Sequence, residues 1–168
     1  IPLRHRMPCS GFLFEEKSGL PHIRRDMMDY LKIPVCEFNN IKLGADWILP
    51  DGTVVPNDRL VFPAEPARRY AYCSDTAFLP ENAALVRGVD LLFHEATFAE
   101  TEARRAAETF HSTAAQAARF ASLAEVRRLV IGHFSSRYED EKQLLEESRS
   151  IFENTVLARE GAWFRVRE

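Results

Sequence analysis

Three short runs of mostly apolar residues, each followed directly by polar side chains, constrain the fold of this sequence more than any other feature. The runs cover residues 69–73, 89–93 and 129–131, and such runs are typical of strands buried on both faces of a sheet. Helical patterns lie between and after them, at 81–87, 100–109, 113–123 and 139–152. This alternation of strands and helices predicts an α/β layer sandwich.

Local signals mark where some of these elements begin and turn. Thr113 followed by Gln116 forms a capping box, which predicts a helix start at this point. Apolar runs at 155–157 and 162–166 surround Glu160-Gly161 and predict a terminal hairpin. Between residues 35 and 66, prolines and turn pairs separate short apolar runs, which predicts hairpins and turns there.

Composition excludes several classes of protein. Of 168 residues, 46% are hydrophobic, as in a globular chain. The 22 Lys and Arg against 25 Asp and Glu give a net charge of −3, so any nucleic-acid surface must be local. No apolar run is long enough for a membrane helix, and the three separated cysteines favour a reducing cytoplasm over a disulfide framework. The first residue is not methionine, and we expect a cut or incompletely observed polypeptide.

Polar residues that follow the three predicted strands are candidates for one shared site. They are Ser74-Asp75-Thr76, His94-Glu95 and Gly132-His133, and the carboxyl ends of strands in α/β sheets are where ligands bind. Asp and His suit zinc or manganese, although a lone Asp can cap a helix and a lone His can be structural. His111 precedes the capped helix, whose first turn attracts phosphate.

The same segments carry a family resemblance. The segments 72–76, 94–98 (His-Glu-Ala-Thr-Phe), 110–113 (Phe-His-Ser-Thr) and 132–138 resemble motifs of ribonuclease Z, the metallo-β-lactamase-fold endonuclease that trims the 3′ end of precursor tRNA. The opening segment 2–12 is similar to a further metal motif of that family. The motif His-x-His-x-Asp-His is absent. The resemblance therefore implies the C-terminal half of an αββα sandwich, here spanning residues 1–168.

Metal ligands and catalytic groups follow from this resemblance residue by residue. It implies two zinc ions per subunit of the full-length enzyme, with His5 on one, His133 on the other and Asp75 bridging them. His111 would stabilise the scissile phosphate or protonate the leaving oxygen, and Glu95 would orient it and raise its pKa. We expect a structural role for the neighbouring His94.

The resemblance also implies residues that contact tRNA. A tRNA-binding arm would occupy about residues 18–57, and the family's homodimer would let the arm of one subunit hold the tRNA that the other cuts. Guanidinium groups grip phosphates, so we expect some of the following to contact tRNA, although those outside the arm can equally be ordinary surface charges. The candidates are Arg24, Arg25, Lys32 and Lys42 in the arm, with Arg68, Arg69 and Arg137 outside it.

Two rival functions remain open on the sequence alone. One is another hydrolase of the metallo-β-lactamase fold, acting on a thioester or a lactam, and the other is a tRNA-binding fragment without catalysis. Two zinc ions sharing one bridging ligand need about five or six protein groups. Since the resemblance supplies only His5, Asp75 and His133, we expect this chain alone to be inactive and to bind zinc weakly or not at all.

Overall fold

The structure is a computed structural model that describes residues 1–167. The chain divides into two compact units. Unit 1 combines Ile1–Glu15 with the residues from Arg68 onward, and unit 2 is Glu16–Ala67. Each unit has its own buried core, so each is described separately.

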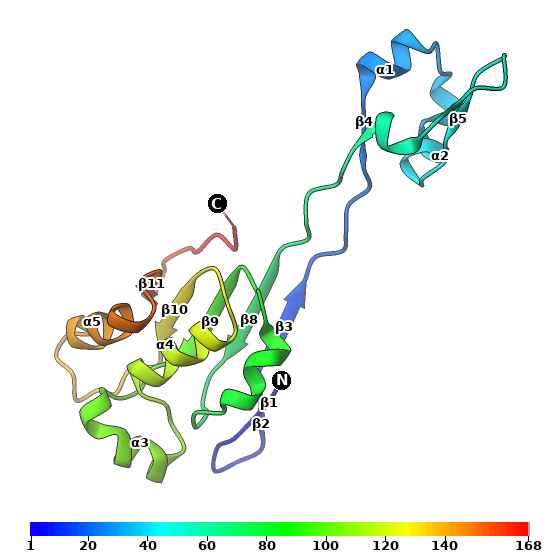
Figure 1. The fold of residues 1–168 in the computed structure, drawn as a ribbon. Helices are drawn as coiled ribbons and strands as arrows, with labels where there is room; N and C mark the ends of the chain where they lie inside the picture. Colours follow the sequence, from blue (N-terminus) through cyan, green and yellow to red (C-terminus); the bar gives the residue numbers. More distant parts are fainter. Residues whose placement is uncertain (168) are drawn as a thin grey trace. The chain divides into compact units, whose positions relative to one another are not determined.

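Unit 1 is built on a five-stranded mixed sheet in the order β11-β10-β9-β8-β3 (Figure 1). Four strands are parallel neighbours, and β3 pairs antiparallel with β8 at one edge. The α/β class and the three predicted central strands are thereby confirmed. The strands are β3 (Phe12–Glu15), β8 (Arg69–Cys73), β9 (Leu91–Glu95), β10 (Leu129–Gly132) and β11 (Thr155–Leu157), and a short hairpin pairs β1 (Pro2–Leu3) with β2 (Cys9–Ser10).

The helices of unit 1 fall within or close to the predicted ranges, but the helix predicted at 139–152 begins only at Lys142, and residues 100–102 of the helix predicted at 100–109 form a 3₁₀ turn. The capping box is confirmed, because Thr113 Oγ1 accepts a hydrogen bond from the Gln116 N–H while the Gln116 side chain accepts one from the Thr113 N–H. The segment expected to be a helix at 81–87 is a 3₁₀ helix. The elements are η3 (Pro80–Val86), η4 (Glu100–Glu102), α3 (Ala103–Thr109), α4 (Ala114–Leu123) and α5 (Lys142–Ile151).

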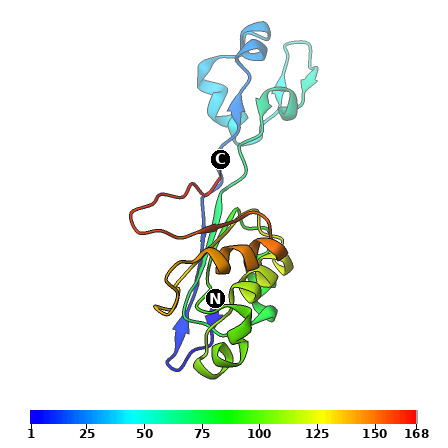
Figure 2. The same cartoon turned by 90° about the vertical axis from the view of Figure 1, so that its left-hand side faces the viewer.

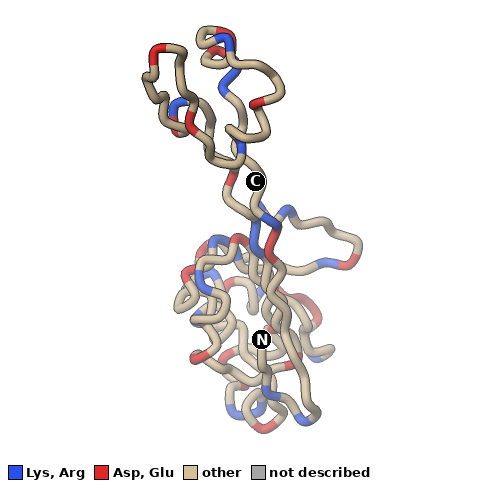
Figure 3. Tube along the Cα trace, turned by 90° about the vertical axis from the view of Figure 1, so that its right-hand side faces the viewer, with Lys and Arg blue, Asp and Glu red and all other residues tan. Residues whose placement is uncertain are grey.

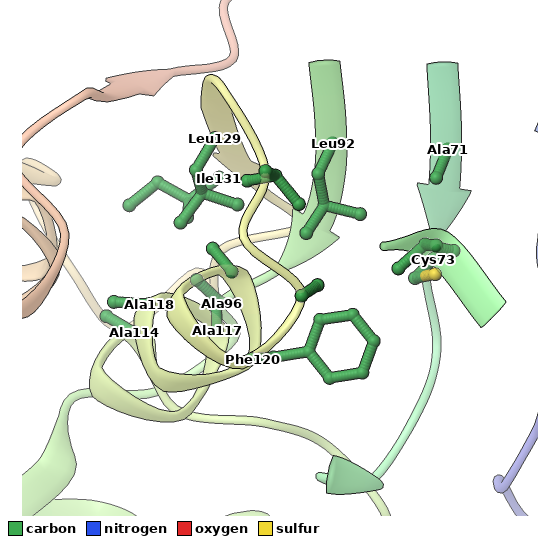
Figure 4. Close-up of a cluster of buried hydrophobic side chains, with 14 of the residues drawn as sticks. Ala71, Cys73, Leu92, Ala96, Ala114, Ala117, Ala118, Phe120, Leu129 and Ile131 are labelled. Atoms are coloured by element: carbon green, nitrogen blue, oxygen red, sulfur yellow. The ribbon is translucent and has the colours of Figure 1, made fainter. Parts of the chain in front are cut away.

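The main core lies between the sheet and α4 (Figure 4). The helix contributes four fully buried alanines and the aromatic ring of Phe120. Small side chains let the helix axis approach the sheet, where Leu92, Leu129 and Ile131 fill the layer. Each of these three side chains, fully buried, stabilises the fold by about 1.5–3 kcal/mol. This packing fixes the ends of the strands that carry the candidate site.

The opposite face of the sheet contacts the C-terminal segment. Tyr70, Phe93 and Val130 alternate with core residues along their strands, and together with Trp163 and Phe164 they line an apolar cavity of about 300 Å³. Figure 2 shows the C-terminal segment (red) on the side of the strands away from α4. One side of the sheet is thus covered by helices and the other by an irregular segment.

The predicted terminal hairpin is wrong. The first run, 155–157, is β11, but it pairs in parallel with β10 because α5 returns the chain to the same end of the sheet. The turn at Glu160-Gly161 does form, with Gly161 in the left-handed region at a φ of 75°. The described residues 162–166 that follow form no strand. Phe164 and Val166 are half-buried at the border of the cavity, whereas Trp163 is 98% exposed.

Unit 2 has two small antiparallel pairs and two short helices around a core of Met28, Ile41 and Leu60. The pair β5–β6 agrees with the expected turns, but α2 and two 3₁₀ turns also lie in the range 35–66, where only hairpins and turns were expected. The elements are β4 (His22–Ile23), α1 (Arg25–Tyr30), η1 (Val35–Glu37), α2 (Phe38–Lys42), β5 (Trp47–Ile48), β6 (Val54–Val55), η2 (Asn57–Arg59) and β7 (Val61–Phe62).

None of the helices within residues 1–167 is long and apolar enough to cross a membrane.

Candidate metal and catalytic site

Asp75 and His133 meet at the carboxyl end of the sheet in unit 1. Asp75 lies two residues after β8, and His133 directly follows β10. His133 Nε2 is 3.1 Å from Asp75 Oδ1. Both residues have left-handed backbones, with φ of 55° and 59°, which costs a non-glycine residue about 1–2 kcal/mol. Strained residues of this kind cluster at functional sites.

The position of His133 depends on the residue before it. A Cβ at Gly132 would lie 2.7 Å from the ring of Phe93 and 3.1 Å from the Ala158 side chain. Glycine therefore lets β10 end in close contact with these neighbours, and His133 emerges at the sheet edge with a side chain that is 42% exposed.

Glu95 is the polar centre of the site, at the end of β9 and fully buried. Its Oε1 accepts the Thr76 N–H at 2.5 Å, and its Oε2 accepts the Ser112 N–H at 3.1 Å. The Thr97 hydroxyl donates to Oε2 at 2.6 Å. Burial alone would raise the pKa of Glu95, but hydrogen bonds from His111, Thr97 and the Ser112 N–H hold this pKa below its ordinary value. Glu95 is therefore a buried carboxylate whose two oxygens both accept hydrogen bonds.

His111 is oriented by that carboxylate. Its Nδ1 lies 3.0 and 3.1 Å from the two Glu95 oxygens. The hydrogen bond to Glu95 raises the pKa of His111 above its ordinary value, against the opposing effect of burial. The ring stacks against His133 with centroids 5.3 Å apart and lies 4.9 Å from the ring of His5. His111 is thus a protonatable group held beside Asp75 and His133.

The donor set at this edge fits a divalent metal ion. Asp75, His111 and His133 each offer one ligand atom, and these atoms lie within 4.8 Å of one another. Nitrogen and oxygen ligands about 2.0–2.2 Å from a tetrahedral zinc ion lie about 3.3–3.6 Å apart, and the 3.1 Å between His133 Nε2 and Asp75 Oδ1 is only slightly shorter. His5 lies outside this group of three among the described residues, and its Nδ1 is 3.2 Å from the Phe110 carbonyl oxygen.

An open pocket of about 490 Å³ lies next to His111. Its lining contains the guanidinium-bearing residues Arg6, Arg105 and Arg137, and it contains no carboxylate among the residues described. Arg137 also lies over the ring of Phe98, 5.9 Å from the centroid. A cationic pocket beside an imidazole suits an anionic group such as a phosphate.

The three arginines outside the arm that were expected to contact phosphate, Arg68, Arg69 and Arg137, differ in their surroundings. Arg69 is held by other groups, because its guanidinium donates to Glu15 and to the Arg87 carbonyl oxygen at 2.7 and 2.8 Å. Arg68 is exposed at the start of the second segment of unit 1. Arg137 lines the pocket, so it is the only one of these three that the structure brings to His111 within the described residues.

The four expected arm cations lie in unit 2 but are not equivalent. Arg24 donates to Asp26 at 2.9 Å and covers the ring of Phe62. Arg25 begins α1 and is exposed, Lys32 follows α1, and Lys42 ends α2. Unit 2 carries six basic and eight acidic side chains, which are interspersed along the chain (Figure 3). Its cations therefore act as local groups within an overall acidic unit.

Three contributors to this site were not predicted from the sequence. Thr97, in the segment His-Glu-Ala-Thr-Phe, contacts both Glu95 and His133. Its place two residues after Glu95 was the available signal. Arg6 and Arg105 line the pocket, and no signal in the sequence distinguishes them from other surface arginines.

Comparisons with known proteins bear on the family and the fold of this chain. A profile of the β-lactamase superfamily domain matches residues 54–134. The curated ribonuclease Z of Bacteroides thetaiotaomicron is 64% identical over 161 residues, covering 96% of this chain and 51% of that protein. The curated ribonuclease Z of Bacteroides fragilis is 61% identical over 161 residues, covering 96% of this chain and 53% of that protein. The chain thus spans about half the length of the curated relatives it matches.

A solved structure supports the fold. The metallo-β-lactamase fold protein YhfI from Bacillus subtilis matches with a TM-score of 0.53 and 21% identity, over 56% of this chain and 39% of that chain. At this identity the likeness concerns the fold alone. With the superfamily match, it confirms the expected metallo-β-lactamase fold class.

Proposed function

Because this chain is a relative of the curated ribonuclease Z proteins within the β-lactamase superfamily, we propose that it supplies part of the active site of a zinc-dependent endoribonuclease. The full-length protein removes the 3′ trailer from precursor tRNA and leaves a 3′ hydroxyl. The observation that carries this proposal is the convergence of Asp75, His111 and His133 around buried Glu95. A metal-ligand group and an oriented proton donor are what phosphodiester hydrolysis needs.

In this proposal His5, Asp75 and His133 would hold zinc, together with further ligands of the full-length protein. Bound zinc would supply an acidified water and neutralise negative charge on the phosphate. Asp75 would contribute its carboxylate, which offers two oxygens and a negative charge. The Nε2 atom of His133 faces Asp75, which supports the assignment of both to one centre, and two ions per subunit follow from the resemblance.

His111 acts as the proton donor. Its Nδ1 is bonded to Glu95, so Nε2 is the atom that can give a proton to the leaving oxygen. The raised pKa of His111 keeps the ring protonated to a higher pH than an ordinary histidine. Arg6, Arg105 and Arg137 line the adjoining pocket and hold the phosphates that flank the scissile bond through charge-assisted hydrogen bonds.

Unit 2 is the tRNA-binding arm of this proposal. It is a separate compact unit with its own core, and Arg25, Lys32 and Lys42 offer cations for backbone phosphates. The resemblance to ribonuclease Z extends the proposal to a cytoplasmic homodimer in which one subunit's arm holds the tRNA that the other subunit cuts. The free thiols of Cys9, Cys36 and Cys73 are compatible with a reducing compartment.

The 168-residue chain by itself is inactive in this proposal. It offers three of the roughly five or six protein groups that two zinc ions need. Elemental analysis after dialysis, paired with a cleavage assay on the same sample, tests this statement. Weakly held or no zinc together with no cleavage is expected. Two tightly held zinc ions per chain with normal turnover would overturn it.

One experiment separates the proposal from its rivals. The full-length protein is assayed for binding and for cleavage of a precursor tRNA that carries a 3′ trailer, with a lactam and a thioester as further substrates. Cleavage that leaves mature tRNA with a 3′ hydroxyl is expected. Binding without cleavage would favour a non-catalytic tRNA-binding protein, and turnover of a thioester or lactam alone would favour another hydrolase of the same fold.

A further inference from the structure

The hydroxyl of Thr97 lies at the junction of three groups in the candidate site. Thr97 is buried, two residues after the end of β9. Its Oγ1 is 2.6 Å from Glu95 Oε2, 2.9 Å from His133 Nδ1 and 2.9 Å from the His133 carbonyl oxygen. A longer contact of 3.4 Å reaches His111 Nδ1. A hydroxyl has one proton and two acceptor lone pairs. The partner that accepts the Thr97 proton therefore determines which of the other partners must donate to the hydroxyl oxygen.

Glu95 determines where the Thr97 proton goes. Each carboxylate oxygen already accepts a backbone N–H, Oε1 from Thr76 and Oε2 from Ser112. Both oxygens are therefore acceptors, and the contact between Oε2 and Thr97 requires the hydroxyl to donate. At 2.6 Å this is the shortest contact of the hydroxyl, in the range of O–H···O⁻ bonds. The neutral carbonyl of His133, at 2.9 Å, is the weaker competitor.

The proton on His133 follows from this assignment. With its only proton directed to Glu95, Thr97 Oγ1 faces His133 Nδ1 with a lone pair. A bond of 2.9 Å between these atoms forms only if Nδ1 carries a proton and donates it. His133 Nε2 is then the ring nitrogen that can bind a metal ion when the ring is neutral. It lies 3.1 Å from Asp75 Oδ1, so without a metal ion between these atoms their contact is a hydrogen bond only if Nε2 also carries a proton.

The same carboxylate fixes the second imidazole directly. His111 Nδ1 lies 3.0 and 3.1 Å from the two Glu95 oxygens, which are acceptors, so Nδ1 carries the proton there too. Glu95 thus holds His111 without an intermediary and His133 through Thr97. In both rings, Nδ1 donates a hydrogen bond within the protein, and Nε2 remains available to a metal ion or a substrate.

We propose that Thr97 is a positioning residue that relays the hydrogen-bond polarity of Glu95 to His133 and thereby reserves His133 Nε2 for metal ligation. The inference deepens the proposed function, on which its metal part rests. A side chain that fixes the tautomer of a metal-binding histidine typically changes metal affinity about 10–100-fold. A purely structural threonine would serve the packing of the turn and leave the His133 proton position unchanged.

Imidazole NMR of ¹⁵N-labelled, metal-free protein tests the relay without any nuclease assay. The spectra are recorded in an Asp75→Asn background at a pH at which the His133 ring is neutral and has one protonated nitrogen. The Asp75 carboxylate, 3.1 Å from Nε2, would itself draw the proton to that nitrogen, whereas an amide can meet Nε2 with or without a proton. In this background we expect His133 to carry the proton on Nδ1. A neutral ring with the proton on Nε2 and Thr97 intact would overturn the proposal, whatever the Thr97 variants do. Because activity is not measured, failure of the relay and failure of the nuclease proposal are distinguishable.

Three variants isolate the hydroxyl. Thr97→Val removes the hydroxyl with little change of shape, and Thr97→Ser retains it. The control is Thr155→Val, which removes the hydroxyl of a buried threonine in β11. Among the described groups, that hydroxyl donates only to the Phe152 carbonyl oxygen. In the Asp75→Asn background, Thr97→Val is expected to move the neutral His133 proton to Nε2. With Asp75 intact, Thr97→Val is expected to lower Co²⁺ affinity of the full-length protein about 10–100-fold. Thr97→Ser and Thr155→Val are expected to resemble the wild type. Wild-type tautomer and Co²⁺ affinity in Thr97→Val would overturn the proposal.

Discussion

His133 Nε2 and Asp75 Oδ1 lie 3.1 Å apart, although the two residues are at the ends of non-adjacent strands and both have left-handed backbones. Only β9 separates β8 from β10 in the sheet, and β9 ends in Glu95 between them. The order of the strands therefore places the buried carboxylate beneath the two candidate ligands. A single sheet edge thus holds the candidate ligands and the group that orients the neighbouring imidazoles.

Loss of the Glu95 charge is expected to change the pH dependence of cleavage. Glu95 raises the pKa of His111, and a proton donor loses activity as the pH rises through its pKa. Glu95→Gln in the full-length protein should therefore move the alkaline fall in kcat to lower pH. His111→Ala should lower kcat about 10²–10⁴-fold, as for other general acids. The measurement is a pH–rate profile on precursor tRNA.

Glu147→Gln is the matched control for this prediction. Glu147 is a partly buried carboxylate on α5 that accepts the Glu100 N–H and a Gln143 side-chain N–H. Its replacement should leave the pH–rate profile unchanged. An alkaline fall at the same pH in the wild type and in Glu95→Gln would show that His111 is not the proton donor.

Removal of the unit 2 cations is expected to weaken binding but leave chemistry unchanged. The variant combines Arg25→Gln, Lys32→Gln and Lys42→Gln, and spares Arg24 because its guanidinium is bonded to Asp26. Affinity for precursor tRNA should fall, and the slope of its salt dependence should decrease by about 1 for each phosphate that the variant no longer binds. Hydrolysis of a small nitrophenyl phosphodiester should change little.

A charge-matched triple variant of unit 1 controls for net charge. It combines Arg87→Gln, Arg119→Gln and Lys142→Gln, three exposed cations that pair with surface carboxylates. Its tRNA affinity should stay close to that of the wild type. Equal loss on tRNA and on the small phosphodiester in the unit 2 variant would mean that this unit supports the fold or the dimer instead of tRNA binding.

A buried ion pair far from the candidate site is expected to make stability depend on pH. Asp90 is 3% exposed. Its carboxylate accepts hydrogen bonds from the Arg69 N–H and from Nε and Nη2 of Arg167. Burial alone would raise the pKa of Asp90, but these bonds hold its pKa below the ordinary value. The stabilisation is therefore present above the unfolded-state pKa of about 3.9 and is lost as the pH falls through the lower folded-state pKa.

Asp90→Asn tests this linkage. At pH 7 the variant should have a free energy of unfolding about 3 kcal/mol lower than the wild type, because it leaves Arg167 without its charged partner. The difference should shrink as urea unfolding is repeated at lower pH, toward about pH 3. A difference that stays constant over this range would mean that the Asp90 charge contributes nothing to stability.

Much of the site could be predicted because its residues are marked by local patterns. Asp75 and His133 each follow an apolar strand, and the Thr113–Gln116 capping box located α4 and therefore His111 before it. These patterns depend on neighbours in the chain, where burial and backbone hydrogen bonding leave a periodic signal. The strand β8 was predicted with both of its ends correct.

Features set by distant contacts could not be predicted in the same way. The pairing of β11 with β10 depends on where α5 returns the chain, and the turn at Gly161 suggested a local hairpin instead. The contact of Thr97 with His133 joins residues 36 positions apart. Helix α1 has no side-chain cap at its N-terminus, and Met28 stabilises it by packing into the core of unit 2. Tertiary packing decided each of these features.

Cleavage by an Asp75 variant is the most direct test of the central claim that this sheet edge forms part of a metal-dependent nuclease site. Asp75→Asn in the full-length protein keeps a side chain of the same shape that tolerates a left-handed backbone but removes the charge. Precursor-tRNA cleavage should fall about 10³-fold, for a loss of several kcal/mol of metal-dependent stabilisation, with little change in thermal stability. Glu153→Gln, at an exposed position after α5, should cleave like the wild type. Cleavage at the wild-type rate by Asp75→Asn would contradict the account.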